Sequence, residues 1–171
     1  VQELLNKRKL SIDTILDFQL GFSPDEWKFL TEKIIAKGLF AAGNTLGIVV
    51  SKNGSNYDMF RNRIMFPIFN EQSQLVGFGG RKQEDDNKDN PKYLNSKDSE
   101  LYKKERVLYG LNLAKKHIRE KGKAILVEGY YDVIGLYDKG VRNVVATCGT
   151  AFTKSHAKIL RKYTDRVVVF Y

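Results

Sequence analysis

The chain has 171 residues, of which 42% are apolar, and its 29 Lys and Arg outnumber its 20 Asp and Glu, which leaves a formal charge of +9. The apolar share excludes a largely disordered chain, and the length suits one domain or two small ones. The single Cys148 excludes an internal disulfide framework and a cysteine-rich zinc site, and no apolar run is long enough to span a membrane. The excess of positive charge favours an anionic partner such as nucleic acid.

The first 40 residues are typical of helices. Ser23-Pro24-Asp25-Glu26 has the pattern of a helix start, with Ser23 as the cap, proline at the first helical position and acids in the first turn. We expect the apolar residues that follow, beginning with Trp27, to face the core.

Short strands follow this helical region. Residues 46–50 read as a strand, and residues 52–55 (Lys-Asn-Gly-Ser) as a turn. Residues 64–69 and 74–78 enclose a polar tetrapeptide and predict a hairpin. Because proline cannot donate to a strand ladder, Pro67 predicts an edge or bulged position.

Three arginines surround this hairpin: Arg61, Arg63 and Arg81. Arg81 follows Gly79-Gly80 directly, and glycines beside an arginine can let a phosphate approach the backbone. The alternative is a solvated arginine after a glycine turn, which the triplet taken alone favours.

A second concentration of charge follows a polar, acidic loop predicted over residues 84–90. Between Lys92 and Lys123 there are ten Lys or Arg and four Asp or Glu, so this segment supplies six of the nine net charges. Such clustering favours a phosphate-binding surface, with Lys92 and Tyr93 placed to meet a phosphate and a base. The alternative for part of it is ordinary solvation of a helix predicted over residues 111–120.

From residue 124 onward, strands alternate with helices. Strands are predicted over residues 124–128, 143–147 and 166–171, and helices over about 131–139 and 154–163. This order predicts a parallel sheet with right-handed crossovers. His117 and His156 lie in helical stretches beside lysines, and we expect both to face solvent.

Glu128 ends the first of these strands, and Asp132 lies in the first turn of the helix that follows. Both would lie at the carboxyl rim of the sheet, where open α/β sheets bind ligands, and close carboxylates favour a cation such as Mg²⁺ or Mn²⁺ between them. Gly149 and Thr150 follow the next strand and would face the same rim, where Thr147 or Thr150 can hydrogen-bond a ligand. The alternative is a strand-ending glutamate and a surface aspartate near a helix start.

The stretch Glu128-Gly-Tyr-Tyr-Asp132 resembles the first acidic motif of the toprim fold, which bacterial primases, type IA and type II topoisomerases and some nucleases share. Five further motifs narrow the resemblance: Arg61-Asn-Arg-Ile-Met-Phe-Pro67, Gly77-Phe-Gly-Gly-Arg81, Pro91-Lys-Tyr-Leu-Asn-Ser96, Leu108-Tyr-Gly110 and Val144-Val-Ala-Thr-Cys-Gly-Thr150. In this order they resemble the RNA-polymerase domain of bacterial DNA primases of the DnaG type, over roughly residues 10–171.

This resemblance implies an α/β fold with a basic mixed α/β subdomain over residues 1–115 and the first part of a toprim subdomain over residues 116–171. It implies synthesis of short RNA primers on single-stranded DNA from ribonucleoside triphosphates, in the bacterial cytoplasm at the nucleoid. Glu128 and Asp132 would be catalytic and would bind Mg²⁺ or Mn²⁺. The implied nucleic-acid and nucleotide contacts are Arg61, Arg63, Arg81, Lys92, Tyr93, Asn95, Lys104 and Arg106.

One departure limits what the resemblance implies. After a strand such as residues 166–171 the family has an Asp-Gly-Asp motif with further metal ligands, whereas this chain ends at Tyr171. The family's zinc-binding domain and its helicase-interacting domain are also absent. We therefore expect an inactive fragment of a primase, whose zinc and whose contact with the replicative helicase belong to other domains. The alternatives are another toprim enzyme, a topoisomerase or nuclease, and a non-catalytic module that binds single-stranded nucleic acid.

Overall fold

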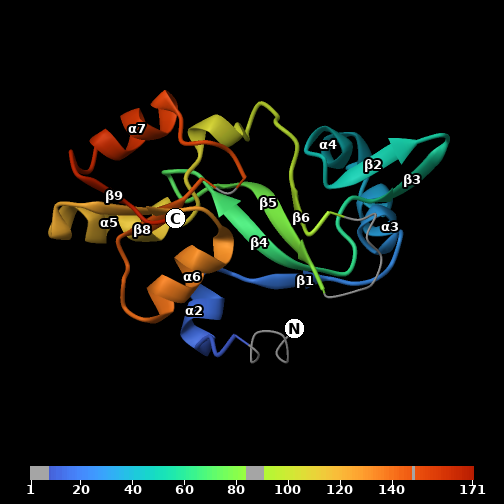
Figure 1. The fold of residues 1–171 in the computed structure, drawn as a ribbon. Coiled ribbons are helices and arrows are strands. Elements are labelled where there is room, and N and C mark those ends of the chain that lie inside the picture. Colours follow the sequence, from blue (N-terminus) through green and yellow to red (C-terminus); the bar gives the residue numbers. More distant parts are fainter. Residues whose placement is uncertain (1–7, 84–90, 148) are drawn as a thin grey trace.

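The computed structural model describes residues 8–83, 91–147 and 149–171, and it combines an antiparallel sheet, a small hairpin and a parallel sheet (Figure 1). The acidic loop predicted over residues 84–90 and the single Cys148 fall outside the described residues. The elements follow in this order: α2 (Ile12–Asp17), β1 (Gly21–Ser23), α3 (Phe29–Ala36), α4 (Phe40–Thr45), β2 (Val49–Lys52), β3 (Ser55–Asp58), β4 (Arg63–Phe69), β5 (Leu75–Lys82), β6 (Tyr93–Asn95), the 3₁₀ turn η1 (Lys104–Arg106), α5 (Leu111–Lys121), β7 (Ala124–Val127), α6 (Tyr130–Asp138), β8 (Val144–Ala146), α7 (Lys154–Arg161) and β9 (Val167–Val169).

The antiparallel sheet has the strand order β1-β4-β5-β6, and its centre is the predicted β4-β5 hairpin. β1 pairs with β4 only from Arg63 to Met65. Pro67 lies beyond that paired segment and next to the register shift between Ile68 and Phe69. Such positions tolerate a residue without an N–H, so the structure confirms the predicted edge or bulged placement.

The smaller hairpin of β2 and β3 lies at one end of the molecule with α3 and α4 (Figure 1). Its turn residues Asn53 and Gly54 have φ angles of 52° and 74°, which suits the predicted turn sequence. The strand begins at Val49 rather than at Leu46, because α4 extends to Thr45 and a short connection follows it.

The parallel sheet has the order β8-β7-β9, with the strand that precedes Glu128 at its centre. Leu126 packs with α5 and α7 on one face, and Val127 packs with α6 on the other. Helices therefore cover both faces of β7, which explains its continuous apolar run. The predicted alternation of strands and helices is confirmed.

α6 joins the two sheets. Its buried residues Tyr130, Val133 and Ile134 share one core with Phe66 and Ile68 of β4. In Figure 1 the antiparallel sheet lies between the β2-β3 end and the parallel sheet, with α6 on the side of the parallel sheet. The carboxyl end of β7 thus faces the antiparallel sheet, which positions the site described below.

The predicted helix start at Ser23 is wrong. Ser23 is the last residue of β1, where it pairs with Arg63, and its hydroxyl donates to the carbonyl of Phe60. α3 begins only at Phe29. Trp27 is also not in the core, because 63% of it is exposed and its ring packs edge-on against Tyr57 instead.

His156 contradicts the expectation of a solvent-facing side chain, since it is fully buried in α7 against η1. His117 is partly exposed and lies 3.3 Å from Glu120 Oε2. Within the described part of the chain, the helices are too short or too polar to cross a membrane.

Candidate active site

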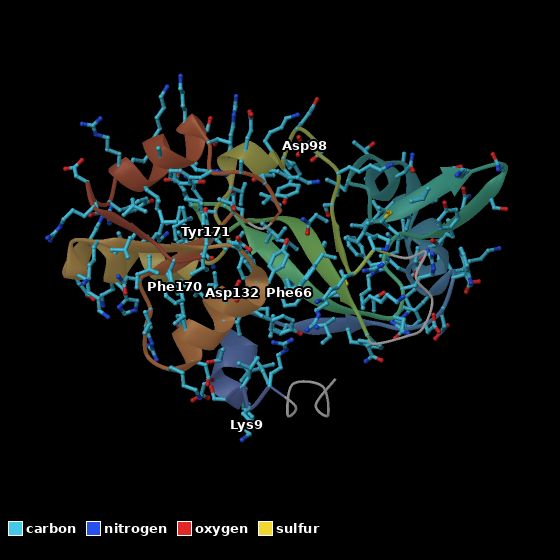
Figure 2. All side chains as sticks on the ribbon, in the orientation of Figure 1. Lys9, Phe66, Asp98, Asp132, Phe170 and Tyr171 are labelled. Carbon is cyan, nitrogen blue, oxygen red and sulfur yellow. The ribbon has the colours of Figure 1, made fainter. Side chains whose placement is uncertain are left out.

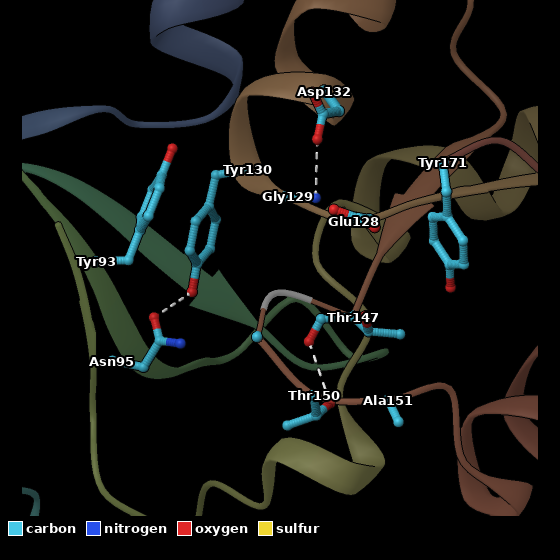
Figure 3. A pocket seen from close by; sticks show the side chains of 11 residues that line it. Tyr93, Asn95, Glu128, Gly129, Tyr130, Asp132, Thr147, Thr150, Ala151 and Tyr171 are labelled. Carbon is cyan, nitrogen blue, oxygen red and sulfur yellow. Dashed lines mark hydrogen bonds between the residues drawn. The ribbon is translucent and has the colours of Figure 1, made fainter. Parts of the chain in front are cut away.

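A pocket of about 570 Å³ opens at the carboxyl end of the parallel sheet and reaches across to β6 (Figure 3). It is lined by the turn after β7, the turn after β8, the edge of β6 and the end of the chain. The lining residues are Tyr93, Asn95, Glu128, Gly129, Tyr130, Asp132, Thr147, Gly149, Thr150, Ala151 and Tyr171. Glu128, Gly149 and Thr150 therefore share one rim, as the strand order predicts.

The two predicted carboxylates lie on one short turn. Glu128 is the first residue after β7 and is exposed. Asp132, the third residue of α6, accepts a hydrogen bond on Oδ2 from the Gly129 N–H at 3.0 Å. This bond satisfies a backbone donor at the helix start and holds Asp132 over the turn that carries Glu128. Figure 3 shows both carboxylates beside Gly129, and Figure 2 labels Asp132 and Tyr171, which both line the pocket, in the half of the molecule that contains the parallel sheet.

Tyr130 anchors this turn to the antiparallel sheet. Its ring stacks on Phe66 of β4 and meets Tyr109 edge to face, with centroids 4.7 Å apart in each case. Its hydroxyl donates to Asn95 Oδ1 of β6 at 2.7 Å. The carboxylate turn and the polar edge of β6 are thus joined by one buried side chain.

The glycines before Arg81 make room for aromatic rings. They lie within β5 rather than in a turn. A Cβ at Gly79 would lie 2.4 Å from Tyr130 Cζ, and a Cβ at Gly80 would lie 2.7 Å from Phe60 Cδ1. Both distances are too short for real contacts, so the internal packing of the sheet requires both glycines.

Arg81 lies beside the pocket among aromatic rings. Its Cζ is 5.0 Å from the ring centroid of Tyr131 and 5.9 Å from that of Tyr93. Its Nε is buried and has no hydrogen-bond partner within the described residues. Burial raises the pKa of the Tyr93 phenol, and the nearby Arg81 charge opposes that rise. Cations interleaved with aromatic faces are the surface on which single-stranded nucleic acids bind.

The other predicted basic residues lie outside the pocket. Arg61 stacks on the exposed ring of Trp27 at 3.9 Å, beside the β2-β3 hairpin. Arg63 is buried and donates through Nη1 to the carbonyls of Gly80 at 3.2 Å and Lys92 at 3.5 Å. Burial, with a smaller effect of Arg61, lowers the pKa of its guanidinium. Lys92 is exposed directly before β6.

Lys104 and Arg106 belong to η1. Arg106 is exposed, and its Nε lies 3.6 Å from Glu105 Oε1. Lys104 is half-buried, with its backbone N–H donating to Asp98 Oδ1 at 3.1 Å. The structure therefore brings Tyr93 and Asn95 into the pocket with the carboxylates, sets Arg81 beside them, and places the remaining predicted cations outside the pocket lining.

Sequence reasoning did not assign Tyr130, Ala151 or Tyr171 to the site. The position of Tyr130 between the two carboxylates is the one local signal, but its partners come from other strands. Thr147 and Thr150, considered as ligand contacts, both line the pocket, and Thr150 Oγ1 donates to the Thr147 carbonyl at 3.4 Å.

The carboxylates fit part of a metal site. Over residues 8–83, 91–147 and 149–171, no three His, Cys, Asp or Glu side chains gather as a complete protein-built metal site would require. Glu128 and Asp132 offer oxygen ligands of the kind that Mg²⁺ and Mn²⁺ prefer, and they border open space. Two carboxylates supply only some of six octahedral positions, so water, substrate oxygens or further residues would complete the shell.

Two protein-family models match the chain. The model described as "DNA primase catalytic core, N-terminal domain" matches residues 1–115, and the model of the toprim domain matches residues 122–171. The DNA primase of Clostridium acetobutylicum is 42% identical over 170 residues, which cover 96% of this chain and 27% of that protein. The DNA primase of Neisseria meningitidis serogroup A is 44% identical over 163 residues, which cover 95% of this chain and 27% of that protein.

Solved structures agree with the sequence matches. The Aquifex aeolicus primase, solved with its zinc-binding and RNA polymerase domains, superposes with a TM-score of 0.90 at 37% identity and covers 99% of this chain and 42% of that one. A DnaG primase catalytic domain bound to single-stranded DNA gives a TM-score of 0.90 at 35% identity, covering 98% of this chain and 54% of that one. The chain thus spans about a quarter of the length of the two relatives named above. From these matches and the fold, the chain belongs to the family of DNA primase catalytic cores, with a toprim domain in its second part.

Proposed function

We propose that the whole protein is a primase, a DNA-directed RNA polymerase that synthesises short RNA primers on single-stranded DNA from ribonucleoside triphosphates during replication. Family membership supports this reaction. The observation that carries it is the shared pocket, which sets Glu128 and Asp132 across from Tyr93 and Asn95.

In this proposal Glu128 and Asp132 hold a divalent cation, Mg²⁺ or Mn²⁺, at the carboxyl end of β7. When bound, such a cation neutralises the triphosphate and stabilises the leaving pyrophosphate. The bond from Gly129 to Asp132 orients one carboxylate oxygen, so that the other is directed to the ligand. Tyr130 keeps the turn at a fixed separation from Asn95, which faces the substrate from the opposite wall.

The cationic and aromatic surface beside the pocket is proposed to hold the template, the primer and the nucleotide. Arg81 and Lys92 contact phosphates and Tyr93 offers a face for a base, contacts that position nucleic acid without reading its sequence. Arg61, Lys104 and Arg106 extend this surface. Because Arg63 is buried, its proposed contribution is to hold β4 against the backbone of β5 and of the segment before β6.

The two-subdomain division after residue 115 remains a proposal. It falls within α5, whose buried face packs against the parallel sheet, so this helix is better counted with the second subdomain. In the whole protein, zinc and the replicative helicase would be bound by further domains, and the reaction would take place in the bacterial cytoplasm at the nucleoid.

De novo RNA synthesis tests the proposal. The full-length protein, incubated with single-stranded DNA, ribonucleoside triphosphates and Mg²⁺ or Mn²⁺, should release short labelled RNA. The 171-residue chain alone should bind single-stranded DNA without making RNA. Relaxation of supercoiled DNA, or cleavage of RNA, without primer synthesis would favour another toprim enzyme. Binding of DNA by the full-length protein without any product would favour a non-catalytic module.

A further inference from the structure

His156 lies fully buried at the start of α7, a helix whose other polar residues are mostly exposed lysines and arginines. Its Nδ1 accepts a hydrogen bond from the Thr153 N–H at 3.2 Å, so the ring proton is on Nε2. Nε2 then donates to the carbonyl of Lys104, 2.9 Å away. The imidazole is therefore a neutral tautomer with both nitrogens engaged.

Thr153 makes a parallel connection. Its hydroxyl accepts from the His156 N–H at 3.1 Å, which caps the helix, and donates to the carbonyl of Glu105 at 2.9 Å. Two side chains of one helix start thus bind two consecutive carbonyls of η1. A 3₁₀ turn of three residues has little stability of its own, so these two bonds, together with the bond from the Lys104 N–H to Asp98 Oδ1, help to fix where it lies.

The two connected segments both border the proposed path of the nucleic acid. Gly149, Thr150 and Ala151, which line the pocket, are separated from Thr153 by Phe152 alone. η1 carries Lys104 and Arg106. The helix start therefore joins a wall of the pocket to a pair of cations that do not line it.

We infer that His156 is a positioning residue, which with Thr153 fixes the Lys104–Arg106 turn against the pocket wall so that both cations meet the phosphates of single-stranded nucleic acid. This inference rests on the proposed function, because it requires nucleic acid at the pocket. His156 itself touches no substrate and acts only through the backbone of η1.

Two substitutions of His156 distinguish the hydrogen bond that its ring donates to the Lys104 carbonyl from the one that it accepts from the Thr153 N–H. In His156→Gln the side-chain amide nitrogen replaces Nε2 and keeps the bond to Lys104. In His156→Asn the shorter side chain can still accept from the Thr153 N–H, as capping residues do, but cannot reach η1. His117→Asn, at a partly exposed histidine on α5, is the matched control.

Binding of a labelled single-stranded oligonucleotide to the full-length protein is measured by fluorescence anisotropy at several salt concentrations. His156→Asn should bind several-fold more weakly at low salt, and its slope of log affinity against log salt should fall by about 0.7 to 1.4, the equivalent of one or two lost phosphate contacts. His156→Gln and His117→Asn should keep the wild-type slope. A purely structural loss would not lower the slope selectively.

A double-mutant comparison completes the test. In a Lys104→Ala/Arg106→Ala protein, adding His156→Asn should not lower the slope further, because the contacts it controls are already gone. If His156→Asn fails to fold, Thr153→Ala removes the bond to Glu105 and should lower the slope in the same way. If the folded His156→Asn or Thr153→Ala protein keeps the wild-type slope, or if His156→Asn lowers the slope further in the Lys104→Ala/Arg106→Ala protein, the inference is overturned while the proposed function stands. A wild-type protein that binds no single-stranded DNA would overturn the proposed function and the inference with it.

Discussion

Substitution of Gly79 by alanine should disturb the candidate site from outside it. The new Cβ would lie 2.4 Å from the Cζ and hydroxyl oxygen of Tyr130. The ring cannot move aside easily, because Phe66 stacks on it at 4.7 Å with planes 13° apart and Tyr109 meets its edge. The ring, and with it the start of α6, must shift.

The magnitude follows from two losses. Overpacking a well-filled core costs about 1–3 kcal/mol. Displacing the Tyr130 hydroxyl breaks its 2.7 Å bond to Asn95, which adds about 1 kcal/mol. We therefore expect Gly79→Ala to lower the free energy of unfolding by about 2–4 kcal/mol, a large part of the roughly 5–15 kcal/mol typical of a domain.

Denaturant unfolding followed by circular dichroism measures this loss. Gly135→Ala is the matched control, since a Cβ there meets no atom within 4 Å and alanine favours the interior of α6, which should raise stability by about 0.5–1 kcal/mol. Adding Tyr130→Leu to Gly79→Ala should cost less than the sum of the two single changes, because the smaller side chain removes the clash. Wild-type stability of Gly79→Ala, combined with weaker binding of DNA, would refute the packing argument and favour a phosphate contact at the glycine.

Three further outcomes are expected. Arg63→Ala should lower the free energy of unfolding by about 2–4 kcal/mol, because it deletes a buried side chain together with its hydrogen bonds to the Gly80 and Lys92 carbonyls, whereas the exposed Arg106→Ala should change it by less than about 0.5 kcal/mol. Equal losses in urea unfolding would contradict the assignment of Arg63 as an internal cation. Arg81→Ala and Lys92→Ala should each lower the slope of log affinity against log salt for single-stranded DNA by about 0.7, the equivalent of one phosphate contact. An unchanged slope in both variants would exclude a phosphate contact for either residue. Burial lowers the pKa of His156, so the unfolded chain takes up a proton at a higher pH than the folded chain does. The free energy of unfolding should therefore have its full value above about pH 6.5 and decrease below that pH by at most about 1.4 kcal/mol per pH unit. His156→Gln should remove this decrease.

The second half of the fold was predictable because its signals are local. Apolar runs of strand length, separated by helical stretches and glycines, indicate the parallel sheet without knowledge of any partner. The hairpin between residues 64 and 78 has a polar turn between two apolar segments, which is again a local pattern. The first 40 residues were harder, since β1 exists only because it pairs with β4, some 40 residues later. Nothing in Ser23-Pro24-Asp25-Glu26 reports that pairing, and the local helix-start pattern prevailed in the prediction.

The site shows the same division. The position of Glu128 and Asp132 at the pocket rim was predictable from their spacing at a strand end, and that of Thr147 and Thr150 from the next strand end. Tyr130 and His156 were not, because their hydrogen-bond partners lie 35 and 52 residues away in the chain. The role of Gly79 depends on a ring from another sheet, so a glycine next to an arginine was equally compatible with a phosphate site.

The rate of primer synthesis by Glu128→Gln, compared with Glu120→Gln, tests the central claim most directly. Both residues are exposed glutamates, but Glu128 lines the pocket, whereas Glu120 lies at the end of α5 near Lys116 and His117. With single-stranded DNA, ribonucleoside triphosphates and Mg²⁺, the full-length Glu128→Gln protein should be slower by at least about 100-fold, because it loses a ligand of the cation. Glu120→Gln should keep the wild-type rate. Equal rates in the two folded variants would contradict the assignment of Glu128 to the catalytic centre.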